Sequence, residues 1–458
     1  MSFLCSKQQF KNNLYGVSVA LKTPKWRILL AMLLTSSAMS LQAQPVLSLA
    51  DVTQKIQRYQ QPDVWQQQQQ ITQFNARQRG LWDNPTLTIQ QTGFKNGQEQ
   101  ELEVTLSQPI DVFSVRKKAA YAANLQGQEV TLNQTLYQAK QGLIILYFWS
   151  EISVLEQEVA VLDQQLKISQ DNLQAATLKQ RAGSISQLDL DRIQISHLEN
   201  QAKSLQQRRA LSVLKQQFAY LWGDDHAEYQ LATQAGLPDE ITNQTVDTTS
   251  SSTHNLYQRS MQLQHAQLQA QADYLKAKSR PMPSVILGTT RVKAAENNVT
   301  DQQVRVGIEI PLTIFNREQY SQQIAQQKMQ LLEQETLRNQ KQNRFDERAL
   351  YAEMSILLEQ YQLLIHQQIP LLNRIRDKMF VGFQAGKYAV TDVQLATSTL
   401  KQRQFESLQD LRAIWQKSLQ LKALHLGIDP ETILNKNALS QLNQSIWNNS
   451  LNLATGGE

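Results

Sequence analysis

The sequence predicts a mainly α-helical protein that also contains two β-hairpins. Three observations support this fold class. Two long polar runs, at about 114–181 and 317–384, contain almost nothing that would break a helix. Two shorter runs, at 86–112 and 284–312, alternate apolar and polar residues with a period of two, which is typical of β-strands. The same succession of helix, hairpin and long helices occurs twice, which indicates an internal repeat.

The composition fits long exposed helices better than compact globules. Of the 458 residues, 41% are apolar and 7% aromatic, and only 16 are glycine and 11 proline. The net charge of +5 carries little information, because many basic residues fall within the first 27 and the others are interspersed with acids. No basic stripe with interleaved aromatic residues is present, which argues against nucleic-acid binding.

The N-terminus has the features of an export signal. Basic residues up to Arg27 precede an apolar run at 28–34, and small residues follow, with plausible cleavage after Ser40 or Ala43. We therefore expect residues 1–43 to be a signal peptide. The run is too short to span a bilayer, and no other stretch approaches 18 apolar residues. Entry into a membrane would therefore have to use β-strands.

Residues that carry catalysis or hold metals are scarce. The only cysteine, Cys5, lies in the segment that we expect to be removed, so the mature chain would contain no disulfide. Of the six histidines only His254 and His265 are close in sequence, and their spacing fits no common pair of metal ligands. There is no phosphate-binding glycine loop, no Ser/His/Asp arrangement and no paired-cysteine site. We expect no enzymatic activity and no cofactor.

Each long helical run ends in a short break, at 181–189 and 384–392, in which Ala-Gly is separated from an aspartate by five residues. A glycine after a helix can adopt positive φ and close the last turn. Ser186 or Thr391, followed by the aspartate, can cap the next helix. Each break is therefore predicted to be the tip of an antiparallel helical hairpin.

The remaining elements follow in the same order in both halves. In the first repeat, 44–253, we expect a helix, two strands, two long helices and a polar surface segment, at 48–80, about 86–108, 114–181, 188–222 and 223–253. In the second repeat, 254–430, we expect a helix, two strands, a long helix kinked at Pro370 and a last helix, at 254–279, about 284–312, 317–384 and up to Leu426. A polar tail at 431–458 completes the chain.

Four strands cannot close a barrel, and each backbone group left unpaired in lipid costs several kcal/mol. The smallest closed membrane barrels have about 8 strands. The chain must therefore oligomerise, or the strands form a small soluble sheet. The alternation fits a barrel wall with Arg305 and Glu309 towards a wet lumen. The residues expected to face lipid are Leu102, Val104, Leu106, Val304, Val306, Ile308 and Ile310.

These features together resemble the outer-membrane efflux proteins of the TolC family, the outer membrane factors, over residues 48–430. The marks of the resemblance are the two tips, an Asn-Pro before the first hairpin and a Pro-x-x-x-Phe pair after each hairpin, at 181–189, 384–392, 84–85, 109–113 and 311–315. The segment 80–87 is similar to the branch that serves heavy-metal exporters.

The resemblance implies a homotrimer with a 12-stranded β-barrel in the outer membrane and a long α-helical barrel in the periplasm. Its partners would be a periplasmic adaptor, also called a membrane fusion protein, and an inner-membrane pump of the RND type. The function would be passive export, with heavy-metal cations as the expected cargo. A type I secretion channel and a drug efflux duct are alternatives. An alternative of a different class is a secreted structural coiled-coil protein without a pore.

The resemblance also implies roles for residues at the tips. Gly183, Ser184, Gly386 and Lys387 would contact the adaptor, although the two glycines are explained equally well as helix terminators.

The periplasmic gate would lie beside the second tip. Asp392 matches the first of two acids that family members place at the constriction, and Leu395 stands where the second acid would fall. Asp189 is the equivalent of Asp392 in the first repeat. Helix capping is an alternative role for both aspartates, and for Asp189 it is the preferred one.

Overall fold

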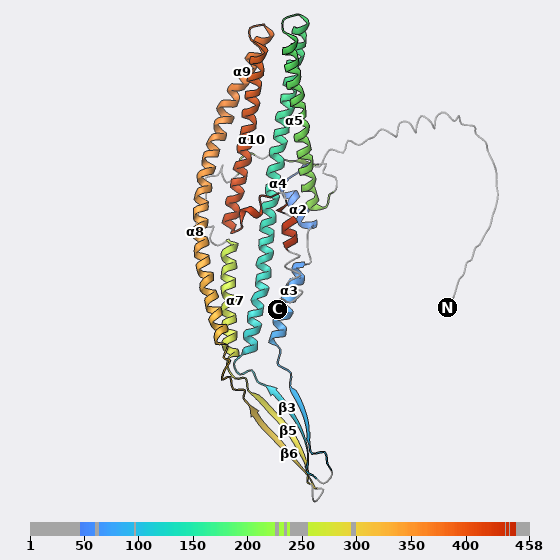
Figure 1. Ribbon diagram of the computed structural model, residues 1–458, viewed down its shortest axis with the longest axis vertical. Helices are drawn as coiled ribbons and strands as arrows, with labels where there is room; N and C mark the ends of the chain where they lie inside the picture. The colour runs from blue at the N-terminus through green and yellow to red at the C-terminus, as the bar shows by residue number, and fades with distance from the viewer. Residues whose placement is uncertain are drawn as a thin grey trace, which may run out of the picture. The chain divides into compact units, whose positions relative to one another are not determined.

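A computed structural model of the chain describes residues 46–59, 64–95, 98–224, 229–232, 236–238, 255–294, 299–435, 437–438 and 440–445. The expected signal peptide and Cys5 lie outside these ranges. The chain divides into two units, and every described residue belongs to the second, Val46–Glu458. The account below concerns this unit (Figure 1).

The helices of the first half are α2 (Leu49–Tyr59), α3 (Val64–Gly80), α4 (Val115–Arg181) and α5 (Gln187–Ala219), and α5 ends in a 3₁₀ turn, η1 (Tyr220–Trp222). The long helices agree with the sequence prediction. The prediction of a single helix at 48–80 is wrong, because α2 ends at Tyr59 and α3 begins at Val64. The segment between them contains Pro62, and a proline removes a hydrogen bond from a helix interior.

The second half contains α7 (Leu256–Lys278), α8 (Gln319–Leu363), α9 (Ile369–Gln384), α10 (Val390–Leu426) and a short 3₁₀ turn, η3 (Pro430–Thr432). A kink is expected at Pro370, and just before it the structure has a π-helical turn, η2 (Leu364–Gln368), between α8 and α9. Proline lacks the N–H group that would continue the α-helical hydrogen bonds, and a single π turn is a rare local departure that occurs inside α-helices. No helix in the described part of the chain is long and apolar enough to cross a lipid bilayer.

The two predicted hairpins form one antiparallel sheet. Its strands are β2 (Thr86–Thr92), β3 (Gln100–Pro109), β5 (Ser284–Lys293) and β6 (Thr300–Glu309), and they lie in that order. Leu106 pairs with Leu87 on one side and Leu287 on the other, and Leu287 pairs with Val306. The hairpins therefore join through β3 and β5, and β2 and β6 are the edge strands among the described residues.

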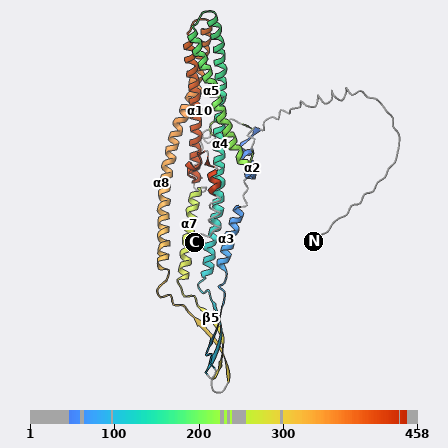
Figure 2. The same cartoon turned by 45° about the vertical axis from the view of Figure 1, so that its right-hand side comes forward.

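Neighbouring helices follow a consistent order along α4. Near the strands the order is α3, α4, α7, α8, and near the tips it is α5, α4, α10, α9. Figures 1 and 2 show these neighbours side by side. The helices α3 and α5 therefore lie at the same edge as β2, and α8 and α9 lie at the same edge as β6.

The largest apolar core lies midway along α4, where α2, α5 and the C-terminal segment pack against it. The rings of Phe148 and Phe218 stack with their centres 5.7 Å apart. Val52 and Ile56 of α2 are fully buried, whereas Tyr59 at its end is exposed. A short parallel pair of strands, β1 (Val46–Leu47) and β4 (Gln230–Leu231), closes this core. The prediction of a polar surface segment at 223–253 did not include β4.

Candidate docking and gating site at the helical tips

The two tips have the same backbone structure. At the first tip Gly183 has φ 70°, and the N–H of Ser184 donates to the carbonyl of Lys179 at 2.8 Å. At the second tip Gly386 has φ 78°, and the N–H of Lys387 donates to the carbonyl of Gly382 at 2.8 Å. This is the Schellman arrangement, in which a residue with positive φ satisfies the last carbonyls of a helix. The predicted helix-terminating role of both glycines is confirmed.

The caps of the two following helices differ. The hydroxyl group of Ser186 accepts a hydrogen bond from the N–H of Asp189 at 3.1 Å, so the predicted cap at Ser186 is confirmed. The predicted cap at Thr391 is wrong, because α10 starts at Val390 and its cap residue is Ala389. Alanine has no side-chain acceptor, and the carboxylate of Asp392 instead accepts from the N–H of Ala389 at 3.0 Å. Asp392 therefore has a helix-capping contact.

The structure brings the two tips together in one apolar cluster. Its buried members come from both hairpins and are Ala176, Ile193, Phe383, Val390 and Val393. The ammonium group of Lys179 donates to the carbonyl of Phe383 and lies 4.5 Å from the centre of its ring. The ring of Tyr388 covers Gly382 so closely that an added Cβ would lie 2.2 Å from a ring carbon. Lys179, Phe383 and Tyr388 were not among the predicted site residues, and apolar spacing before the tip is a signal that could have indicated Phe383.

The residues predicted to contact an adaptor lie on the surface of the tips. Gly183, Ser184, Gly386 and Lys387 are all exposed. An added Cβ at Gly183 or Gly386 would meet nothing within 4 Å, so both backbones face open space. The four residues form two separate surface patches, one at each tip.

The residues predicted to form a gate are not joined to one another. Asp189 is half-buried, hydrogen-bonded to Ser186, and its carboxylate lies 3.7 Å from the Arg192 guanidinium. Asp392 is half-buried beside the N-terminus of α10, and the side chain of Leu395 is 68% exposed. Each aspartate is held within the first turn of its own helix, where a negative charge is favoured by the helix dipole.

Beneath the tip cluster, the hairpins meet through polar side chains. The amide of Gln165 donates to that of Gln404 at 3.0 Å, and the Lys401 ammonium donates to Asn200 at 3.0 Å. Gln165, Asn200 and Lys401 line a cavity of about 40 Å³, and the carbonyl oxygen of Gln165 is buried with no partner among the described residues. Burial lowers the pKa of Lys401, and the nearby Lys203 lowers it further. A space of this size holds a water molecule.

Below this polar layer a buried ion cluster links α4 to α10. The guanidinium of Arg412 lies 3.1 Å from the carboxylate of Glu151 and 2.9 Å from that of Glu158. The side chain of Glu158 is 3% exposed and also accepts a hydrogen bond from Gln207. Within the described ranges, no group of three or more His, Cys, Asp or Glu side chains is arranged to hold a metal ion.

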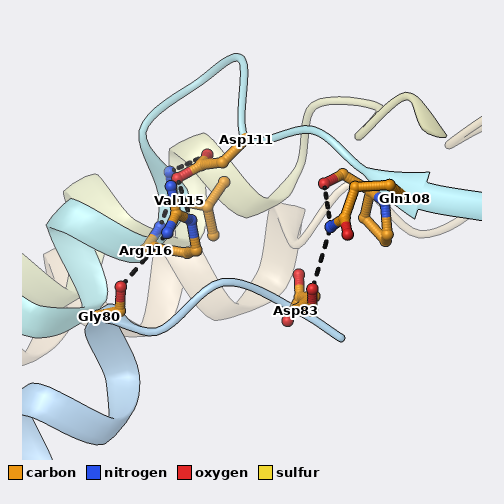
Figure 3. A network of polar contacts seen from close by, with 7 residues as sticks. Gly80, Asp83, Gln108, Asp111, Val115 and Arg116 are labelled. Carbon is orange, nitrogen blue, oxygen red and sulfur yellow. Dashed lines mark hydrogen bonds and ion pairs between the residues drawn. The ribbon is translucent and has the colours of Figure 1, made fainter. Parts of the chain in front are cut away.

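Where the strands join the helices, a polar network fixes the start of α4 (Figure 3). The carboxylate of Asp111 accepts from the N–H groups of Val115 and Arg116, at 2.6 Å and 3.1 Å, and pairs with the Arg116 guanidinium at 3.2 Å. That guanidinium reaches the carbonyl of Gly80 and lies 3.6 Å from the ring centre of Trp82. The end of α3 is thereby tied to the beginning of α4.

The strand register places the residues expected to face lipid on one side of the sheet. Leu87, Leu106, Leu287 and Val306 form one cross-strand row, and Ile89, Val104, Thr289 and Val304 form the next. Val304, Val306, Ile308 and Ile310 are all exposed. On the opposite side Arg305 reaches over Gly288 to pair with Glu103. One face of the sheet is therefore apolar and the other polar.

No family model matches the chain, and no curated protein matches it. Solved structures do. The outer membrane protein VceC of Vibrio cholerae is 13% identical with a TM-score of 0.65, over 83% of this chain and 96% of VceC. CusC, studied for its folding and transmembrane channel formation, is 14% identical with a TM-score of 0.65, over 83% of this chain and 92% of CusC.

The outer membrane channel CmeC of Campylobacter jejuni is 10% identical with a TM-score of 0.60, over 87% of this chain and 89% of CmeC. Each alignment spans most of both chains, so the likeness concerns the whole arrangement of hairpins and strands. The chain has the fold of outer-membrane channel proteins. The predicted fold class, long helical hairpins with four strands, is confirmed.

Proposed function

We propose that the chain is a TolC-family outer membrane factor, the passive exit channel of a tripartite efflux system in the cell outer membrane. The observation that carries this proposal is the four-stranded sheet, whose exposed apolar face is carried at the end of two long helical hairpins. An apolar outer face opposite a polar one is what a membrane barrel requires. The likeness to solved outer membrane channels supports the same function.

The edges of the chain support a homotrimer. The strand β2 and the helices α3 and α5 lie at one edge, and β6, α8 and α9 lie at the other. A head-to-tail contact between different edges can close into a ring. In such a ring the strand layer and the helix layer would close together, and three copies would supply the twelve strands that the family resemblance implies.

The length of α4 separates the tips from the sheet. Its 67 residues extend about 100 Å at a rise of ~1.5 Å per residue, enough to carry the tips well into the periplasm. We propose that a periplasmic adaptor binds the exposed tips at Gly183, Ser184, Gly386 and Lys387, and that an inner-membrane RND pump supplies the energy. The channel itself catalyses nothing.

The proposed gate consists of Asp392 and Leu395, with Asp189 in the equivalent position of the first hairpin. Three copies of Asp392 would place a ring of carboxylates near the tips, which attracts cations. Since the family's second acid is replaced by Leu395, the constriction would be partly apolar. Compared with a constriction formed by two acidic rings, this constriction would conduct cations more slowly in its closed state.

The cargo proposed from segment 80–87 is heavy-metal cations. A type I secretion channel and a drug duct remain alternatives, because these uses share the same channel architecture. Deleting the gene and measuring growth in zinc, cobalt, cadmium, copper and common drugs separates metal export from drug export, and the identity of the neighbouring pump and adaptor separates both from type I secretion. Sensitivity to metals alone supports the heavy-metal proposal, whereas sensitivity to drugs alone contradicts it.

The channel itself is tested by isolating the full chain from an outer-membrane fraction. We expect heat-resistant trimers that form ion-conducting pores in planar bilayers. A monomer without conductance would instead indicate the secreted coiled-coil protein. The Asp392→Ala variant should change the block of single channels by divalent cations, and unchanged block would exclude Asp392 from the gate.

Adaptor docking is tested with two proline variants. Gly386→Pro forces φ to about −65° where the chain has 78°, so the tip must reshape. We expect folded trimers that no longer crosslink to the adaptor or export. Gln187→Pro is the control, since Gln187 is the first residue of α5 and proline is tolerated there. Normal crosslinking by Gly386→Pro would refute docking at this tip.

A further inference from the structure

Four segments connect the strands to the helices at one level of the molecule. They are 77–83, 109–118, 276–283 and 310–318, and we call them the collar. The strand register aligns them, because Pro109 pairs with Ser284 and Ser284 pairs with Glu309. The N–H of Ile110 also donates to the carbonyl of Pro283 at 2.8 Å. Residues far apart in sequence therefore lie in one band around the chain.

The collar is strongly basic. It contains nine basic residues and three acidic ones, which are Arg77, Arg79, Arg116, Lys117, Lys118, Lys276, Lys278, Arg280 and Arg317 against Asp83, Asp111 and Glu318. Its formal net charge is therefore +6, whereas the complete chain of 458 residues has +5. The collar is therefore a locally basic band, because residues 28–458 as a whole contain 40 basic and 40 acidic residues.

Most of this charge has no counterion within the described residues. Arg116 pairs with Asp111, and Lys278 pairs with Glu318 at 3.0 Å. The basic residues that are exposed and form no ion pair with another described residue are Arg77, Arg79, Lys117, Lys276, Arg280 and Arg317. The guanidinium of Arg280 lies 5.0 Å from the ring centre of Phe113, and Arg280 is exposed. The collar therefore presents cations that anions can reach.

Large apolar side chains are exposed among these cations. They are Leu81, Trp82, Val112, Ile310, Leu312, Ile314 and Phe315, and Phe315 is 91% exposed. The apolar face of β6 runs into them without a break, because Val304, Val306, Ile308, Ile310 and Leu312 are alternate residues and all exposed. This alternation therefore continues past Glu309, the last residue of β6, into the collar.

We infer that the collar binds the phosphate groups of anionic phospholipids at the rim of the membrane. This inference rests on the proposed function, which places the sheet in the membrane. At the end of an apolar band, exposed aromatic and aliphatic side chains reach the acyl chains, while long basic side chains extend to the headgroups. Each lysine or arginine near an anionic bilayer surface contributes about 1 kcal/mol, which is roughly fivefold in affinity. An acidic protein partner would need the cations but not the continuous apolar stripe.

The test uses the full-length protein in bilayers of phosphatidylcholine with or without phosphatidylglycerol. Native mass spectrometry and a labelled lipid measure how much phosphatidylglycerol the protein retains and how tightly. The collar variant is Lys117→Gln, Lys276→Gln and Arg280→Gln together. The matched control removes three exposed cations far from the collar, as Lys167→Gln, Lys203→Gln and Lys341→Gln. A third variant, Lys117→Arg with Lys276→Arg, keeps the charge.

We expect the collar variant to lose at least about tenfold in affinity for phosphatidylglycerol, and its remaining affinity to depend less on salt. The control and the arginine variant should stay within about twofold of the wild type. Wild-type affinity in a collar variant that still inserts and conducts would overturn the inference, as would an equal loss in the control. Failure of the wild type itself to insert or conduct would instead refute the proposed function.

Discussion

The ammonium group of Lys179 on α4 donates a hydrogen bond to the carbonyl of Phe383 on α9 and also lies over the ring of that residue. The last carbonyls of a helix have no partners within the helix, and a positive charge there is favoured by the helix dipole. A single side chain of the first hairpin therefore binds the C-terminal end of a helix in the second hairpin, where the Gly386 N–H also donates to the Phe383 carbonyl. This contact joins the two tips within one chain.

Removing this charge should loosen the tips. In Lys179→Met the side chain keeps an apolar stem of similar length but loses the ammonium group that donates to the carbonyl and lies over the ring. We expect spin labels at Ser184 and Lys387 to give a broader distance distribution and the resting pore to leak more ions. Lys167→Met, at an exposed site on the same helix, is the control. Unchanged distances in Lys179→Met would show that the apolar cluster alone holds the tips.

The close contact between Gly382 and Tyr388 predicts a non-additive pair of substitutions. Gly382→Ala should destabilise the protein by about 1–3 kcal/mol, because the new Cβ would displace the ring. In a Tyr388→Ala background the same change should become neutral or stabilise slightly, since alanine favours a helix by roughly 1 kcal/mol over glycine. A double-mutant cycle of thermal or chemical unfolding measures the difference. Equal effects in both backgrounds would contradict the contact.

The ion cluster of Arg412 predicts a large loss of stability. Arg412→Met would leave the carboxylates of Glu151 and Glu158 beside each other without their cation. Breaking such a buried pair costs about 3–5 kcal/mol, and the partial exposure of Arg412 places the expected loss at the lower end. Adding Glu158→Gln should restore part of it. If Arg412→Met unfolds at the wild-type temperature, the cluster contributes nothing to stability.

Asp410 on α10 predicts a pH-dependent gain. Burial and then the nearby Glu406 raise the pKa of Asp410, and one of its carboxylate oxygens is buried with no partner among the described residues. A raised folded pKa means that the native state favours the protonated acid, so stability falls as the pH rises through that pKa. Asp410→Asn should therefore be more stable than the wild type at pH 7.

The gain from Asp410→Asn should disappear below about pH 3.8, where aspartate is protonated in the folded and unfolded states alike. Unfolding in denaturant across this range measures the difference between the variant and the wild type. Asp171→Asn, at an exposed site on α4, should show no such dependence. A gain of the same size at low pH would exclude Asp410 as its source.

Much of the fold was predictable because it depends on local patterns. The period of two placed the strands and their apolar face, and the glycines at 183 and 386 marked turns that need positive φ. The repeat gave the order of the elements. These signals act within a few residues, so one sequence is sufficient to read them.

The contacts that join the hairpins were not predictable in this way. Lys179 and Phe383 are 204 residues apart, and no local pattern pairs them. The strands β1 and β4 have two residues each, too few to show an alternation. The predicted cap at Thr391 was wrong because the second tip has Ala389 where the first has Ser186. The carboxylate of Asp392 accepts from the N–H of Ala389 instead.

The free edges at β2 and β6 have a consequence for genetics. In a ring of three, as proposed, the first contact leaves two open edges, and the last copy completes two contacts at once. A copy with one damaged edge would therefore spoil every ring that it enters. In a cell making equal amounts of normal and damaged copies, only about one ring in eight would contain normal copies alone. Mutations at these edges should be dominant over the normal gene, whereas mutations that prevent folding altogether should be recessive.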